Sequence, residues 1–447
     1  MSAHAAQLLI LNRKLARNKL FHYPCRLLLA VSDFLSRGPK DGLMSGKKKS
    51  IWKTEDGQMN RQSAVNNGLA VFVVMGILLL SVSPLAKAQS DALGQIYVSA
   101  ANVSTNIPGI HTYAEPPNGF NPVTATDVEL ATYGFPPRPD QQADPDHYAL
   151  WERAMTAAKI RWNGELKPQP GKRAMIPAGS SVLPETVHPE VTGPQRISTA
   201  NASGVILTNK QKTFNKNSFY EIFTVISVPV VQEPFGSSSC SPGYWEEESI
   251  AGIDGYIYTV DGVNLFEPGL EGGVSADVYC SEPNIYSAFF GWQSFSGMAG
   301  TTHVFNVNPG DLFYTNQYVT GPNNASVFLE DMTTLTYNSY SVSTPGIIGK
   351  TANWIVDRAC CNPYPDPYAL ANSIGISFEN GGAVINVDDG KNFYPGSQAS
   401  STQILTMTDD EGDQNIEIVN QGINGYQGLN SLWFEVTGCA YSGGCTP

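Results

Sequence analysis

The sequence predicts an all-β protein, an antiparallel β-sandwich of the concanavalin A-like or lectin-like jelly-roll type. From about residue 197 onward, short runs of β-branched and aromatic residues alternate with turns rich in Gly, Pro, Asn and Asp. No strong helical periodicity interrupts these runs. The β-rich part spans roughly 230–250 residues, a size that one all-β domain reaches.

The expected strands follow one another closely along this part of the chain. They are 205–207, 220–228, 256–260, 302–307, 312–314, 326–329, 375–378, 383–387 and 432–436. Each is a run of the Val, Ile, Tyr, Phe and Thr type that favours a pleated, half-buried surface.

The 447-residue chain is too long for one average domain, and its start has the sequence of a leader. An apolar run from Gly68 to Val82 follows Arg61 and precedes Ala86-Lys87-Ala88, which predicts a secretory signal peptide at 59–88, cut after Ala88. Residues 1–58 are then a gene-model extension. A membrane anchor is the alternative, but the run is shorter than the ~20 residues that a span needs, so we expect a secreted protein without a stable anchor.

Residues 89–195 are rich in proline and turn formers, and we interpret them as a pro-segment or spacer. One helix is expected here, capped near Asp144 and carrying an apolar stripe through about Trp162. The alternative is a small ordered layer that packs on the main domain. The β-sandwich domain itself is assigned to 196–447.

The mature chain is strongly acidic. After residue 88, 14 basic residues stand against 36 acidic ones, and residues 217–447 hold only Lys350, Arg358 and Lys391 against 25 acids. Such a surface disfavours nucleic acid and anionic membranes as partners. It loses charge in an acidic medium, which is consistent with work at acid pH. The run Glu246-Glu247-Glu248 is expected on the surface.

Six cysteines remain after the leader, an even number that suggests disulfides in an exported chain. No Cys/His zinc spacing is present, so no metal and no cofactor are expected. The acidic run 409–413 could bind Ca²⁺, although a solvated turn is the favoured interpretation.

Histidine is scarce in the β-rich part, where only His303 occurs after residue 195. The HExxH, GxSxG and phosphate-loop motifs are also missing from the sequence. Nucleophilic triads and zinc hydrolysis are therefore disfavoured, and carboxylate acid–base chemistry remains.

Several short segments carry a family resemblance. They are Gly252-Ile253-Asp254-Gly255, Leu270-Glu271-Gly272-Gly273, Tyr286–Trp292, Asn308–Asp311 and Asn353-Trp354-Ile355-Val356-Asp357. In order and spacing, over roughly 197–438, the chain resembles the glutamic peptidases, also called the eqolisin or peptidase A4 family.

The resemblance implies a β-sandwich endopeptidase in which a Gln and a Glu activate water. By position, Glu271 stands for the Gln and Asp357 for the Glu, while Asn353 stands for another glutamate of the same strand motif. A strand glutamate of the family corresponds to Gly291. Two carboxyls facing each other titrate as a pair, so Glu271 and Asp357 are the predicted catalytic residues of an acid-active peptidase.

Asp254, Asn353, Trp292, Tyr286 and Phe289 are predicted to support the site or bind substrate. Two other functions stay open. One is a catalytically silent module that binds a peptide or a polysaccharide through these aromatics. The other is glycoside hydrolysis by Glu271 and Asp357. Both hydrolytic functions require the two carboxyls to lie within about 10 Å of each other.

Overall fold

The structure is a computed structural model that describes a large part of the chain after residue 93. The described residues are 94–157, 159–169, 195–199, 202–209, 211, 213–233, 244–255, 257–260, 263–266, 268–279, 282–293, 299–321, 323–344, 346–357, 369–385, 391–393, 401–408, 414–420 and 432–436. The predicted extension, the signal peptide, the acidic run 409–413 and all seven cysteines lie outside them.

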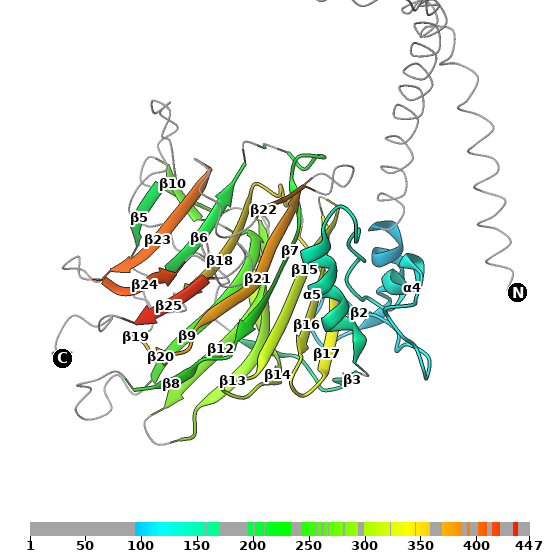
Figure 1. Cartoon of the computed structure of the whole chain (residues 1–447), viewed down its shortest axis with the longest axis horizontal. Helices are drawn as coiled ribbons and strands as arrows, with labels where there is room; N and C mark the ends of the chain where they lie inside the picture. Colours follow the sequence, from blue (N-terminus) through cyan, green and yellow to red (C-terminus); the bar gives the residue numbers. More distant parts are fainter. Residues whose placement is uncertain are drawn as a thin grey trace, which may run out of the picture. The chain divides into compact units, whose positions relative to one another are not determined.

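The prediction of an antiparallel β-sandwich is confirmed. The first sheet contains, in spatial order, β4 (Lys167–Gln169), β14 (Ala299–Asn306), β13 (Ile285–Gln293), β12 (Gly269–Tyr279), β9 (Tyr244–Asp254), β18 (Thr351–Asp357), β6 (Ala202–Thr208), β23 (Thr402–Thr408) and β5 (Gln195–Thr199) (Figure 1). Every neighbouring pair in this sheet is antiparallel except β23 with β5.

The second sheet is ordered β2 (Ile110–Thr112), β17 (Thr336–Ser343), β16 (Asn324–Asp331), β15 (Leu312–Gly321), β7 (Phe219–Ser227) and β21 (Ser377–Ile385). Beyond β21 lie β22 (Lys391–Phe393) and β25 (Leu432–Val436). Strand β24 (Gln414–Asn420) pairs with both β25 and β23, so it joins the two sheets by hydrogen bonds.

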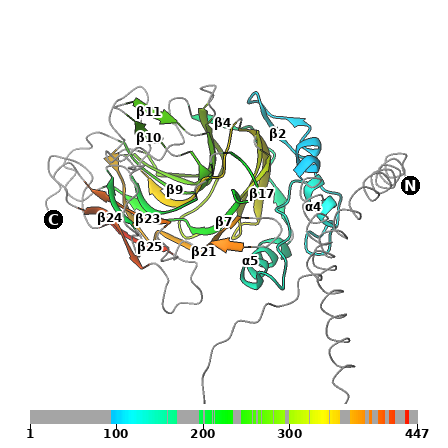
Figure 2. The ribbon, with the colours of Figure 1, turned by 90° about the horizontal axis from the view of Figure 1, so that it is seen from above.

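Short strands complete the architecture. They are β1 (Val103–Ser104) on β2, β3 (Ile160–Arg161) on β17, β19 (Ala369–Leu370) on β9, the hairpin β10 (Ile257–Val260)–β11 (Val263–Phe266), and β8 (Val230–Gln232) paired with β20 (Asn372–Ile374). In Figure 2, α4 and α5 gather near β17, whereas β23, β24 and β25 lie on the other side of the sandwich.

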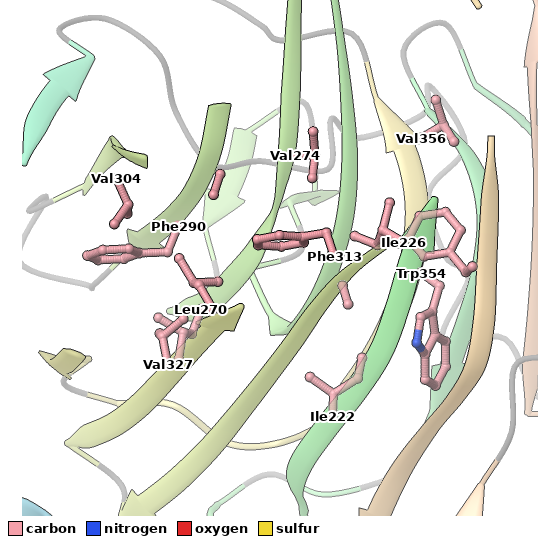
Figure 3. Packing of buried hydrophobic residues seen from close by; sticks show 14 of the residues in the cluster. Ile222, Ile226, Leu270, Val274, Phe290, Val304, Phe313, Val327, Trp354 and Val356 are labelled. Carbon is pink, nitrogen blue, oxygen red and sulfur yellow. The ribbon is translucent and has the colours of Figure 1, made fainter. Parts of the chain in front are cut away.

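The main core fills the space between the two sheets. Leu270 and Val274 of β12 and Trp354 of β18 come from the first sheet, and Ile222 of β7 and Phe313 of β15 come from the second (Figure 3). The sheets lie close together at Gly272, because a Cβ there would lie 2.7 Å from Nε2 of Gln317 on β15. The face of β12 that carries Gly272 is therefore the inner face of the first sheet. The opposite face, which carries Glu271, is its outer face.

Residues 94–157 and 159–169 form an ordered layer, most of which lies on the second sheet, while β4 pairs with β14 of the first. Residues 94–100 are helical, followed by α4 (Asp127–Thr132) and α5 (Pro145–Thr156). Trp151 and Met155 of α5 are fully buried against a cluster that includes Phe223, Tyr314 and Phe328 of the second sheet. The described part of this region is thus packed on the main domain, and its removal as a pro-segment stays a prediction.

The expected helix is present but shorter than predicted. Asp144 caps α5 by accepting a hydrogen bond from the His147 N–H at 3.3 Å, as its sequence indicates. The helix ends at Thr156 because Ala157 is extended, and Ile160 and Arg161 instead pair with β17. Helix α4 was missed, although Thr126 and Glu129 form a capping box that a sequence search can detect.

Candidate functional site

The candidate site is a row of side chains across the outer face of the first sheet. The register pairs Glu271 of β12 with Gly291 of β13 on one side and with Gly252 of β9 on the other. Gly252 is in turn paired with Asn353 of β18. Directly opposed residues point to the same side of a sheet, so Glu271 and Asn353 share the outer face with only a glycine between them.

Gly252 makes this approach possible. A Cβ added at Gly252 would lie 3.2 Å from Asn353 Oδ1 and 3.2 Å from the Glu271 Cβ. The two side chains therefore converge over the same backbone position, and any residue larger than glycine would separate them. In the sequence Gly252-Ile253-Asp254-Gly255, a glycine thus occupies the position between Glu271 and Asn353, where a side chain would not fit.

Glu271 is a buried carboxyl with no charged partner among the described residues. It is 8% exposed, and its Oε1 has no hydrogen-bond partner among the described residues. Burial alone raises the pKa of Glu271 to about 8. A buried acceptor that the fold leaves unsatisfied is what a binding or catalytic site requires for its ligand.

Asn353 is held from behind by the turn that ends β9. Its Nδ2 donates to the backbone carbonyl oxygen of Asp254 at 3.4 Å. This bond is long, and a carboxamide nitrogen carries two N–H groups. Asn353 therefore retains one N–H for a ligand, while its Oδ1 is the atom that lies over Gly252.

Asp254 organises the start of β18. Its carboxylate accepts hydrogen bonds from the backbone N–H groups of residues 348–351, at 2.8, 2.6, 2.6 and 2.9 Å. Its own backbone has φ 55°, a left-handed conformation that non-glycine residues adopt when local hydrogen bonds support it. Asp254 thus supports the site, as predicted, by fixing the strand that carries Asn353.

The structure does not bring Glu271 and Asp357 together. Asp357 is paired with Glu248 of β9, which is paired with Ser275 of β12, four residues beyond Glu271. Four residues along a strand and two strand spacings place the two Cα atoms about 16 Å apart. The predicted pair therefore does not form one site. Of the two motif positions on β18, 353 and 357, only 353 lies level with Glu271.

Asp357 belongs to a second, acidic group on the same face. It is buried with Glu248, Glu246 and Asp277, and Ser275 Oγ lies 3.2 Å from carboxyl oxygens of both Glu246 and Asp277. The expectation that 246–248 lie on the surface was wrong. Because side chains alternate along a strand, Glu247 lies on the inner face instead. Burial there raises the pKa of Glu247 to about 8, and the Ser249 hydroxyl donates a hydrogen bond to its carboxyl.

The three predicted aromatic residues do not line an open cleft. Tyr286 and Trp292 are buried in the main core on the inner face, and the Tyr286 hydroxyl accepts a hydrogen bond from the Val231 N–H at 3.2 Å. Phe289 is on the outer face but is fully buried in a small cluster with Ile250 and Ile355. The sequence could not separate these cases, because aromatic residues suit both core and cleft positions.

Two further properties concern the described part of the chain. No group of three or more His, Cys, Asp or Glu side chains there has the geometry of a metal site. Within the same residues, no helix combines the length and the apolar character of a membrane span.

A two-sheet sandwich in which a carboxyl and an amide converge on the outer face is a candidate hydrolase. Residues 200–418 match the model of the Peptidase A4 family. This region of the chain belongs to that family, the glutamic peptidases. No curated protein sequence matches the chain significantly.

Several solved structures of glutamic peptidases are similar to the chain. Scytalido-glutamic peptidase with a transition-state analog inhibitor has 17% identity and a TM-score of 0.39, covering 53% of this chain and 98% of its own. SCP-B, an eqolisin in complex with the tripeptide Ala-Ile-His, has 18% identity and a TM-score of 0.38 over the same shares. Aspergilloglutamic peptidase from Aspergillus niger has 19% identity and a TM-score of 0.34, covering 43% of this chain and 99% of its own.

Proposed function

We propose that this protein is a peptidase in which Glu271 activates water and Asn353 binds the oxygen of the scissile carbonyl. The observation that carries this proposal is the convergence of Glu271 and Asn353 over Gly252. The family resemblance implies an amide on the β12 segment and a carboxyl on the β18 segment. Here the β12 segment carries the carboxyl, Glu271, and the residue level with it on β18 is an amide, Asn353.

The chemistry follows from these two groups. Ionised Glu271 takes a proton from a water molecule, whose oxygen forms a bond to the peptide carbonyl carbon. The Asn353 N–H that is not used by Asp254 donates to the developing oxyanion. Protonated Glu271 then gives the proton to the leaving nitrogen, the C–N bond breaks, and a carboxylic acid and an amine are released.

This arrangement changes the expected pH dependence. With Asn353 in place of a second carboxyl, Glu271 is the one titrating group of the pair. Its pKa of about 8 means that the base is protonated in acid. We therefore propose hydrolysis that increases from neutral pH toward about pH 8–9 rather than an acid optimum.

The other candidate functions are distinguished by the same geometry. Glycoside hydrolysis by Glu271 and Asp357 is disfavoured, because their Cα atoms lie about 16 Å apart and side chains on one face of a sheet stand roughly parallel, whereas the paired carboxyls of glycosidases lie about 5–10 Å apart. A silent module that binds peptide or polysaccharide through Glu271 and Asn353 would bind without cleaving. Secretion remains a proposal that rests on the sequence of residues 59–88.

The deciding experiment is cleavage of an unfolded protein substrate by the purified chain between pH 3 and 10. Cleavage that Glu271→Gln abolishes and that Asp357→Asn leaves within about threefold of wild type supports the proposal. Equal loss in both variants would assign the chemistry to another pair. No cleavage at any pH, with peptide binding retained, would establish the silent binding module.

A further inference from the structure

A cavity whose lining includes neither Glu271 nor Asn353 lies between the N-terminal layer and β17. Its volume is about 450 Å³, within the range of small-molecule sites. Strands β2 and β3 dock one after the other on β17, at residues 340–342 and 336–337. The cavity is lined by residues of both strands and by Asn338 and Tyr340 of β17.

Arg161 is the central charged group of this cavity. Its Nη2 donates to Thr112 Oγ1 at 2.7 Å and to the Tyr113 carbonyl at 2.5 Å, and its Nε donates to Asn338 Oδ1 at 3.4 Å. These contacts fix the plane of the guanidinium. Its Nη1 makes no hydrogen bond to a described residue, and no ion pair joins Arg161 to a described carboxylate.

A fixed, half-buried guanidinium without a counter-ion favours a carboxylate ligand. The two other cations of the layer that lie closest to its core show the contrast. Lys159 is paired with Glu330, and Arg138 lies 3.7 Å from Asp127. Among the described residues, Arg161 has no such anionic partner.

The rim of the cavity has the opposite charge. Glu115 and Glu165 are exposed lining residues, and neither forms an ion pair with a described cation. They repel a ligand with several negative charges and attract one with a positive end. The half-buried indole of Trp162, another lining residue, supplies an apolar surface in the cavity.

We infer that this cavity binds a short peptide with a free C-terminal carboxylate and a basic side chain. The carboxylate contacts Arg161 Nη1, the aliphatic part of the ligand lies on Trp162, and the ammonium group faces Glu115 and Glu165. Peptides of this class carry the free carboxylate that peptide hydrolysis produces. The cavity is nevertheless lined by neither Glu271 nor Asn353, so binding there does not depend on their chemistry.

The test is calorimetric titration of the full chain carrying Glu271→Gln with the dipeptide Val-Lys. Amidation of its C-terminus should weaken binding at least about tenfold, the loss expected for one charge-assisted hydrogen bond. Val-Glu should bind more weakly than Val-Lys. Equal binding of acid and amide, preference for glucuronate over Val-Lys, or no binding of Val-Lys at millimolar concentration would overturn the proposal.

Two sets of variants locate the binding. Arg161→Gln should abolish the preference for the free carboxylate, while Lys167→Gln, which removes an exposed charge outside the cavity, should leave Kd unchanged. If Arg161→Gln does not fold, the double variant Glu115→Gln/Glu165→Gln decides, because both side chains are exposed. It should abolish the preference for Val-Lys over Val-Glu, and an unchanged preference would overturn the assignment.

Discussion

Glu271 and Asn353 lie level with each other on β12 and β18, separated by Gly252 of the intervening strand. The pairing means that the carboxyl and the amide of this site have exchanged strands relative to the arrangement that the family resemblance implies. Substituting both residues would return the amide to β12 and the carboxyl to β18.

The first prediction concerns that reversal. Glu271→Gln should lower kcat/KM by at least about 1,000-fold, because the general base is lost. Adding Asn353→Glu should recover part of the activity, since a carboxyl returns to the other side of Gly252, and the recovered rate should increase with pH as that carboxyl ionises. Rates of peptide cleavage for the two single variants and the double variant form the cycle. No recovery in the double variant would show that the two positions do not act together.

The second prediction concerns stability against pH. The folded pKa of Glu271 is raised from 4.5 to about 8 by burial, so its protonated form favours the folded state. That contribution is present below about pH 4.5 and is lost as the pH rises to about 8. Denaturant unfolding should therefore show that wild type loses free energy of unfolding relative to Glu271→Gln across this window. Glu247, whose pKa is also raised to about 8, is present in both proteins and cancels in the difference.

The third prediction concerns Asp254. Asp254→Ala leaves four backbone N–H donors of residues 348–351 without their acceptor and should cost at least about 3 kcal/mol of unfolding free energy. Asp140→Ala is a suitable control, because Asp140 accepts two loop N–H groups at an exposed position and should matter far less. Chemical denaturation measures both. Similar losses in the two variants would contradict a special role for Asp254.

The fourth prediction concerns the N-terminal layer. Trp151 of α5 is fully buried in the cluster that includes Phe223 and Tyr314 of the second sheet, and its Nε1 donates to the Pro136 carbonyl at 3.2 Å. Trp151→Ala should lower the unfolding free energy of the whole domain by about 3–5 kcal/mol. The exposed Val128→Ala in the same layer should change it by less than about 0.5 kcal/mol. A layer that unfolds in a separate, earlier transition would show that it is a removable segment.

The fifth prediction concerns the buried contact between Lys159 and Glu330, which joins the chain after α5 to β16. Burial lowers the pKa of Lys159 and raises the pKa of Glu330 to about 7. Lys159→Met alone should cost about 3–5 kcal/mol, because it leaves Glu330 buried without its cation. The double variant Lys159→Met/Glu330→Leu should recover most of that loss. Additive losses in a double-mutant cycle would show that the two side chains are not coupled.

The fold could be predicted from the sequence because strand patterns and turn residues are local signals. Runs such as 302–307 and 432–436 gave strands close to their observed bounds. The end of α5 could not be predicted in the same way, since Ile160 continues a helical stripe in the sequence but pairs with β17 in the fold. There, tertiary pairing overrides the local pattern.

The site was predicted in part. Glu271, Asn353 and Asp254 were identified by motif, and the structure places all three around Gly252. The choice of Asp357 as the partner of Glu271 required the strand register, which depends on contacts between distant segments. The roles of Tyr286 and Trp292 also depended on it, because a shift of one residue exchanges the two faces of a strand.

The short strands of the N-terminal layer have a further consequence for solubility. β4 pairs with residues 301–303 of β14, at the outer edge of the first sheet, while β2 and β3 together occupy the outer edge of β17 in the second. Unpaired edges of this kind are templates for intermolecular strand addition. The layer thus covers one edge of each sheet. A chain without the layer would expose two unpaired strand edges, at which molecules could pair with one another and aggregate.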